Sequence, residues 1–113
     1  MIKIITEKIT RDDLRAIAKE QFGDMVKAVA DIEEKIMAIG GELHADEEAL
    51  LLRHGSRQEN LWGINLYPDI AGDAWIEFNS MINFRPSSGN RTRGVDNAAI
   101  RQKIKAVADS LIA

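Results

Sequence analysis

The spacing of apolar residues at the start of the chain predicts one strand followed by one helix. Isoleucines at positions 2, 4 and 5 are typical of a short strand. Thr10 is a good helix N-cap, and Asp13 stands three residues later, where it can complete a capping box. Apolar residues then recur at helical spacing: Leu14, Ile17, Ala18 and Phe22. Gly23 is a stop signal, so we expect the helix to end there.

Residues 25–44 fit two different structures. As a helix, they carry an apolar stripe made of Met25, Val29, Ile32 and Ile36. As a hairpin that turns at Glu34 and Lys35, they place Ala30 opposite Ile39 on one face and Lys27 opposite Glu42 on the other. The hairpin is favoured because it accounts for residues on both faces through to Leu43, and the helix stays open as the alternative.

The rest of the chain predicts a short helix, a hairpin and a final helix. Asp46 can cap a helix over residues 47–53 that ends at Gly55. Residues 61–67 and 75–85 are expected to be strands, with Trp62 in the core and Trp75 on the polar face. If the loop between them closes symmetrically, Leu66 faces Ile76 and Asn65 pairs with Glu77. After a loop rich in Gly, Ser, Asn and Arg, Asp96 is expected to cap the last helix. Its apolar stripe is Ile100, Ile104, Val107 and Leu111.

This order of elements predicts an α+β fold in one domain, residues 1–113. We expect an antiparallel-rich sheet of about five strands with two main helices packed on one face, because such helices bury their apolar stripes against a sheet. At 113 residues the chain has the common size of one domain. A homo-oligomer is expected, because a domain this small is only marginally stable alone.

Composition narrows the classes of function. The chain has no cysteine, so disulfides and thiolate metal sites are excluded. It has no long apolar run of the kind found in signal peptides or membrane-spanning helices, and a cytoplasmic location is expected. The net charge of −3 argues against strong non-specific binding of nucleic acid. Residues 85–105, however, carry six basic residues against one acidic residue, Asp96.

Four stretches of the chain carry a resemblance to a known family: GGELHADEEALLLRHGS (40–56), LWGINLYPD (61–69), INFRPSSGNR (82–91) and FGDMVKAVADIE (22–33). Together they resemble a family of small bacterial and archaeal proteins described as a domain of unknown function. The resemblance covers most of the chain and implies a compact stand-alone domain. It implies no activity and assigns no functional residue.

One candidate catalytic set lies at alternating positions: Glu42, His44 and Asp46. On an extended strand these side chains point to one side, where an imidazole and two carboxylates can bind a divalent metal or form an acid–base pair. The alternative is structural: Glu42 pairs with Lys27, and Asp46 caps a helix. The set lacks an obvious second histidine ligand, so no metal site is assigned.

A second candidate is a ligand-binding surface on the polar face of the second hairpin and in the arginine-rich loop after it. Side-chain amides are unusual in strands, and arginine suits carboxylate and phosphate groups. The expected ligand-binding residues are Asn65, Glu77, Asn79, Asn83, Arg85, Ser87, Asn90, Arg91 and Arg93. The structural alternative is a solvated strand face and a turn-rich connector.

These observations favour a small binding or regulatory module that recognises an anionic small molecule or an acidic partner, without a cofactor. A small hydrolase or metal-dependent enzyme that uses Glu42, His44 and Asp46 is one alternative. An RNA-binding protein that uses the basic C-terminal segment is the second alternative. RNA binding is disfavoured by the net negative charge and by the absence of an aromatic stacking pattern around the arginines.

Overall fold

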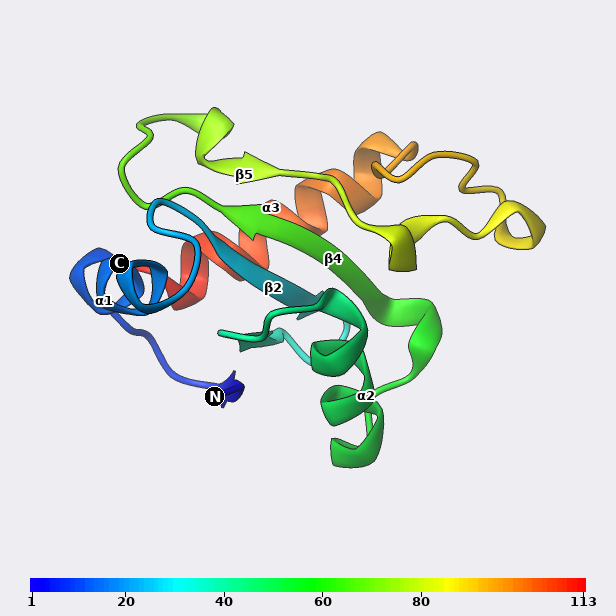
Figure 1. The fold of residues 1–113 in the computed structure, drawn as a ribbon. Coiled ribbons are helices and arrows are strands. Elements are labelled where there is room, and N and C mark those ends of the chain that lie inside the picture. The colour runs from blue at the N-terminus through cyan, green and yellow to red at the C-terminus, as the bar shows by residue number, and fades with distance from the viewer.

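The computed structural model describes all 113 residues and contains five strands and three α-helices (Figure 1). In chain order these elements are β1 (Lys3–Ile5), α1 (Arg11–Glu20), β2 (Val26–Asp31), β3 (Ile36–Ile39), α2 (His44–His54), β4 (Leu61–Leu66), β5 (Ile76–Glu77) and α3 (Ala98–Leu111). Short 3₁₀ turns connect several of them, among them Met81–Asn83 and Pro86–Ser88. The α+β class is therefore confirmed, and no helix is both long enough and apolar enough to cross a membrane.

All five strands join one antiparallel sheet in the order β1-β3-β2-β4-β5. Residues 26–39 form the hairpin β2–β3, so the hairpin prediction is confirmed and the helical alternative is wrong. The predicted register is wrong by two residues, because Ala30 pairs with Met37 rather than with Ile39. The cause lies in the turn: the Asp31 carboxylate accepts from the amides of Glu33 and Glu34, and the turn is centred on these two residues, one residue earlier than predicted.

Helix α1 follows its local signals closely. The Thr10 side chain accepts from the Asp13 amide, and the Asp13 carboxylate accepts from the Thr10 amide, so the predicted capping box is present. The helix ends at Glu20, before Phe22, a residue that is 42% exposed. Phe22 is therefore not part of the buried helical stripe.

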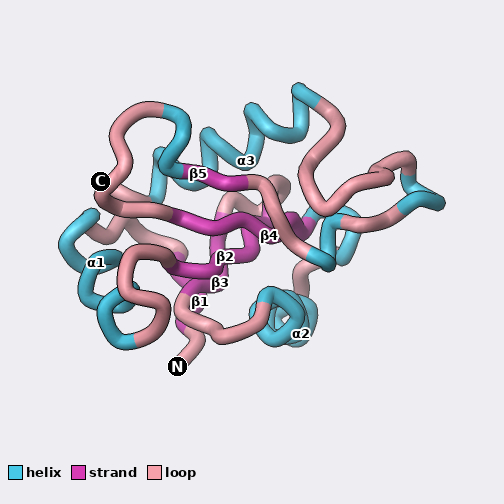
Figure 2. Tube along the Cα trace, turned by 45° about the horizontal axis from the view of Figure 1, so that its top comes forward, coloured by secondary structure: helices cyan, strands magenta, loops and turns pink.

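The sheet has an apolar cluster on each face. The larger cluster joins α1 and α3 to residues such as Ala28, Ala30 and Ile64. The smaller cluster joins Leu51 of α2 to Val29 of β2 and to residues of β3 and β4. Helices α2 and α3 accordingly lie on opposite sides of the strands (Figure 2). The fold thus has three helices, not two main ones, since α2 is as substantial as α1.

The second hairpin is much shorter than predicted. The pairs Asn65–Glu77 and Leu66–Ile76 confirm the predicted register, but β5 ends at Glu77 instead of continuing to Arg85. Trp75, expected on the polar face, is 97% buried in the larger core, with the Arg11 guanidinium 4.1 Å from its ring centre. The chain beyond β5 leaves the sheet, and the outer edge of β4 is completed by side chains instead.

Candidate functional site

The side chain of Asn83 takes the place of a missing strand beside β4. Its Oδ1 accepts from the Gly63 amide at 2.8 Å, and its Nδ2 donates to the Gly63 carbonyl at 2.9 Å. Nδ2 also donates to the Arg93 carbonyl at 3.0 Å, and the residue is fully buried. Asn83 was expected to bind a ligand, but its hydrogen-bonding groups are already used by the fold.

Asn90 and Asp96 hold the arginine-rich loop in a fixed shape. The Asn90 Nδ2 donates to the carbonyls of Asn83, Thr92 and Gly94, and its Oδ1 accepts from the Asp96 amide. The Asp96 carboxylate in turn accepts from the Arg91 amide and the Thr92 hydroxyl. Asp96 is therefore a loop residue and not the predicted N-cap of α3. Asn97 is the N-cap, because its side chain accepts from the amides of Ala99 and Ile100.

Arg85 continues the same edge of β4. Its guanidinium donates to the carbonyls of Ile82 and Gln58, each at 3.1 Å, and to that of Leu61. The guanidinium carbon lies 4.3 Å from the centre of the Trp62 ring, in cation–π geometry. No carboxylate forms an ion pair with Arg85. Burial accordingly lowers the pKa of Arg85.

A cavity of about 490 Å³ opens beside this arginine. Arg85, Trp62, Ser88 and Asn90 line one part of it, and its other lining residues are Glu59, Gly89, Asp96, Asn97 and Ile100. We call it the Arg85 cavity. Its volume lies within the range of small-molecule sites. Ser88 is held next to the arginine, because its amide donates to the Arg85 carbonyl at 3.0 Å.

The two acidic residues of the Arg85 cavity have other partners. Glu59 lies 3.8 Å from the Arg57 guanidinium in an exposed ion pair. Both carboxylate oxygens of Asp96 accept hydrogen bonds within the loop, one from the Thr92 hydroxyl and one from the Arg91 amide. These hydrogen bonds lower the pKa of Asp96, and the charge of Arg101 lowers it further. Arg85 forms no ion pair, and the only opposite charge that favours its protonated form is that of Glu48, whose effect is smaller than that of burial.

The remaining predicted ligand-binding residues separate into two groups. Ser87, Arg91 and Arg93 are exposed residues of the loop, and they do not line the Arg85 cavity. Asn65 and Glu77 lie at the other end of β4, together with exposed Asn79. The strand face that was expected to unite all these residues is therefore divided, because the chain leaves the sheet after Glu77.

Asn65 and Glu77 form a small polar network with two further residues. The Asn65 Nδ2 donates to Glu77 Oε1 at 2.8 Å, and the Tyr67 hydroxyl donates to the same oxygen at 3.2 Å. Asn65 is buried, and its Oδ1 has no hydrogen-bond partner. The nearby imidazole of His44 donates from Nε2 to the Ile64 carbonyl at 2.8 Å. Burial lowers the pKa of His44, which therefore stays neutral near pH 7.

The predicted catalytic set does not assemble. Helix α2 begins at His44, so His44 and Asp46 do not alternate on a strand, and the premise of that prediction is wrong. His44 is buried beneath the helix, whereas Glu42 and Asp46 are exposed. No group of three or more His, Cys, Asp or Glu side chains is arranged to hold a metal ion.

The sequence reasoning missed Glu47, the most unusual ionisable residue of the chain. Its side chain is fully buried, Oε2 accepts from the Gly41 amide at 2.9 Å, and Oε1 has no partner. Burial raises the pKa of Glu47 to about 9. A helix that begins at residue 44 places His44, Glu47 and Leu51 on one face, so the correct helix start was the signal that could have revealed it.

Comparison with known proteins identifies the family but adds no function. The family model described as "Protein of unknown function (DUF5674)" matches residues 3–111, so the chain belongs to this family. The resemblance inferred from the sequence motifs is confirmed at the level of a family of unknown function. No curated protein and no solved structure matches the chain.

Proposed function

We propose that this protein is a small ligand-binding module, and that the Arg85 cavity binds an anionic ligand through a carboxylate or phosphate group. The observation that carries the proposal is a partly buried guanidinium without a carboxylate partner at the wall of a 490 Å³ cavity. A charge removed from water is costly unless an opposite charge or several dipoles compensate it. An oxyanion in the cavity supplies that opposite charge.

The hydrogen bonds of Arg85 support a preorganised site. A guanidinium carries five N–H donors, and Arg85 uses three nitrogens to hold three main-chain carbonyls. Each Nη group therefore keeps one N–H for a ligand. Because the stacked Trp62 ring and the carbonyls fix the guanidinium plane, little side-chain entropy is lost on binding. The hydroxyl of Ser88 is a second donor at the cavity wall.

The test uses a pair of neighbouring serines. Ser88→Glu introduces a carboxylate at the wall of the Arg85 cavity, where it competes with the ligand for the guanidinium. Ser87→Glu introduces the same charge one residue away, outside the lining, and is the matched control. Both residues are exposed in the turn Pro86–Ser88, so neither change disturbs the core. Binding of benzoate and of inorganic phosphate is measured by calorimetry at low ionic strength.

We expect saturable binding of at least one of the two anions to the unchanged protein. The Ser88→Glu variant is expected to lose about tenfold or more in affinity, while the Ser87→Glu variant changes by less than about threefold. A preference for benzoate indicates a carboxylate ligand, and a preference for phosphate indicates a phosphate ester. Equal loss in both variants, or no binding of either anion, contradicts the proposal.

A further inference from the structure

The outer face of helix α2 carries an apolar surface that is open to solvent. Glu47 and Leu51 point from this helix toward the sheet and are fully buried. On the opposite side of the helix, Ala45, Ala49 and Leu52 follow one another at helical spacing. Leu52 is 39% exposed although it is a large apolar residue. A surface helix normally presents charged and polar side chains at such positions, so this face differs from an ordinary solvated one.

Two exposed apolar side chains extend this surface beyond the helix. Met81 is 64% exposed and Phe84 is 51% exposed, and both belong to the turn that packs beside α2. Ile82 of the same turn packs against the apolar cluster that contains Leu51 of α2. Three of the seven large apolar residues that the fold exposes therefore gather at one place, which favours an interaction site over scattered exposure. We call this surface the α2 patch; its members are Ala45, Ala49, Leu52, Met81 and Phe84.

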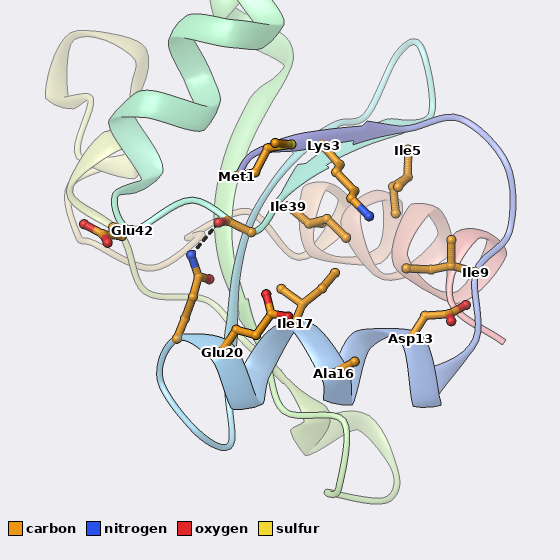
Figure 3. A pocket seen from close by; sticks show the side chains of 12 residues that line it. Met1, Lys3, Ile5, Ile9, Asp13, Ala16, Ile17, Glu20, Ile39 and Glu42 are labelled. Carbon is orange, nitrogen blue, oxygen red and sulfur yellow. Dashed lines mark hydrogen bonds between the residues drawn. The ribbon is translucent and has the colours of Figure 1, made fainter.

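The charges beside the α2 patch are divided between the two ends of the helix. Asp46 lies in the first turn and Arg53 in the last turn, seven residues apart and therefore on the same side of the helix. Both side chains are exposed, and neither forms an ion pair within the chain. Figure 3 shows the carboxylate of Glu42, two residues before α2, pointing away from Glu20 of α1. The N-terminal end of α2 is thus acidic, and its C-terminal end is basic.

We propose that the α2 patch is the contact surface of a homodimer, in which α2 packs antiparallel against α2 of a second copy. A two-fold axis near the middle of the helix places the acidic end of each α2 beside the basic end of the other. Asp46 of one copy then lies opposite Arg53 of the second copy, and the symmetry creates this pair twice. Leu52 packs over the small side chain of Ala49 of the second copy, which lets the two helices approach closely.

The α2 patch fits a second copy better than an unrelated partner, because it is complementary to itself. It combines an apolar centre with one acidic end and one basic end, and only the antiparallel arrangement brings opposite charges together. A parallel arrangement places Asp46 next to Asp46 of the second copy and is disfavoured. The contact involves one helix and one turn from each copy, so we expect a weak dimer with a dissociation constant of about 1–100 μM.

The experiment reverses one charge at a time and then mixes the two variants. Sedimentation velocity is measured on the full chain from about 10 μM to about 1 mM, a range chosen to span the expected dissociation constant. Asp46→Arg and Arg53→Asp are each expected to weaken dimerisation about tenfold or more, because both symmetric pairs become repulsive. An equimolar mixture of the two variants restores both attractive pairs, so we expect it to form a heterodimer with about the affinity of the unchanged protein.

The matched control is Lys103→Asp, which makes the same change of charge at an exposed position of α3 on the other side of the sheet. It is expected to leave dimerisation unchanged. The mixture also tests the fold of the two variants, since only correctly folded chains form the heterodimer. The proposal is overturned if the unchanged protein is monomeric at about 1 mM, well above the expected dissociation constant. It is equally overturned if the single reversals weaken the dimer no more than the control does, or if the mixture stays monomeric.

Discussion

The buried carboxyl of Glu47 makes a quantitative prediction about stability and pH. The native side chain keeps its proton up to a pKa of about 9, whereas the unfolded side chain releases it above its ordinary value of 4.5. Between these values the unfolded state binds fewer protons than the native state. The free energy of unfolding therefore falls as the pH rises, by about 1.4 kcal/mol per pH unit for this one group.

Glu47→Gln removes the titrating proton, so position 47 no longer contributes to the pH dependence of the free energy of unfolding. The carboxamide oxygen can still accept from the Gly41 amide, and the group has no charge at any pH. At pH 7, which is 2.5 units above the ordinary pKa of 4.5, keeping Glu47 protonated in the native state lowers the free energy of unfolding by about 3 kcal/mol. Burying the extra amide donor costs about 1 kcal/mol, so we expect the variant to be about 2 kcal/mol more stable at pH 7.

Urea unfolding measured from about pH 7 to about pH 9 tests the slope. The lowered pKa of His44 has the opposite effect on the pH dependence of stability, but only below the ordinary histidine pKa of 6.5. It stabilises the native state above pH 6.5, and this stabilisation is lost as the pH falls below that value. The window above pH 7 therefore isolates Glu47. The unchanged protein and the control Glu33→Gln are expected to lose stability with rising pH, and Glu47→Gln is expected to show a nearly flat profile. Parallel profiles for all three proteins refute the reasoning.

Three further predictions concern the edge of β4 and the cap of α1. Asn83→Ala leaves the buried polar groups of Gly63 unpaired, so we expect a loss of about 2–4 kcal/mol in urea unfolding, against little change for exposed Asn79→Ala. Gly63→Ala places a methyl group 2.6 Å from the Ser80 side chain, so we expect the free energy of unfolding to fall by about 1–3 kcal/mol in thermal melts. Adding Ser80→Gly to this variant is expected to restore part of that loss. Thr10→Ala removes the cap of α1, and a loss of about 1 kcal/mol by thermal unfolding is expected; an unchanged melting temperature contradicts the role of the capping box.

Local signals were sufficient where a structure depends on neighbouring residues. The capping box at Thr10 and Asp13 predicted the start of α1, and the register of Asn65 with Glu77 followed from symmetric closure of the loop between the two strands. The β2–β3 register was wrong because the choice depended on one side chain: Asp31 binds two turn amides, and no apolar pattern records that interaction.

The candidate site was harder to predict because polar residues in the sequence do not reveal their partners. Asn83 and Arg85 alternate as strand residues do, but their side chains bind the main chain of β4 and replace the strand that was expected there. Glu47 stands in a charged stretch that is typical of a solvated helix face, yet the start of α2 turns it toward the sheet. Both outcomes depend on contacts between segments that are distant in sequence.

The most direct test of the proposed function observes the Arg85 guanidinium itself during titration with benzoate. Its N–H groups donate to the carbonyls of Ile82, Gln58 and Leu61. We expect these hydrogen bonds to slow hydrogen exchange enough for the signals to be followed by ¹⁵N NMR. If the Arg85 cavity binds an oxyanion, the Arg85 side-chain signals shift in a saturable manner and the shift is lost in Ser88→Glu. Unchanged Arg85 signals, or shifts confined to the exposed side chains of Arg91 and Arg93, contradict the account.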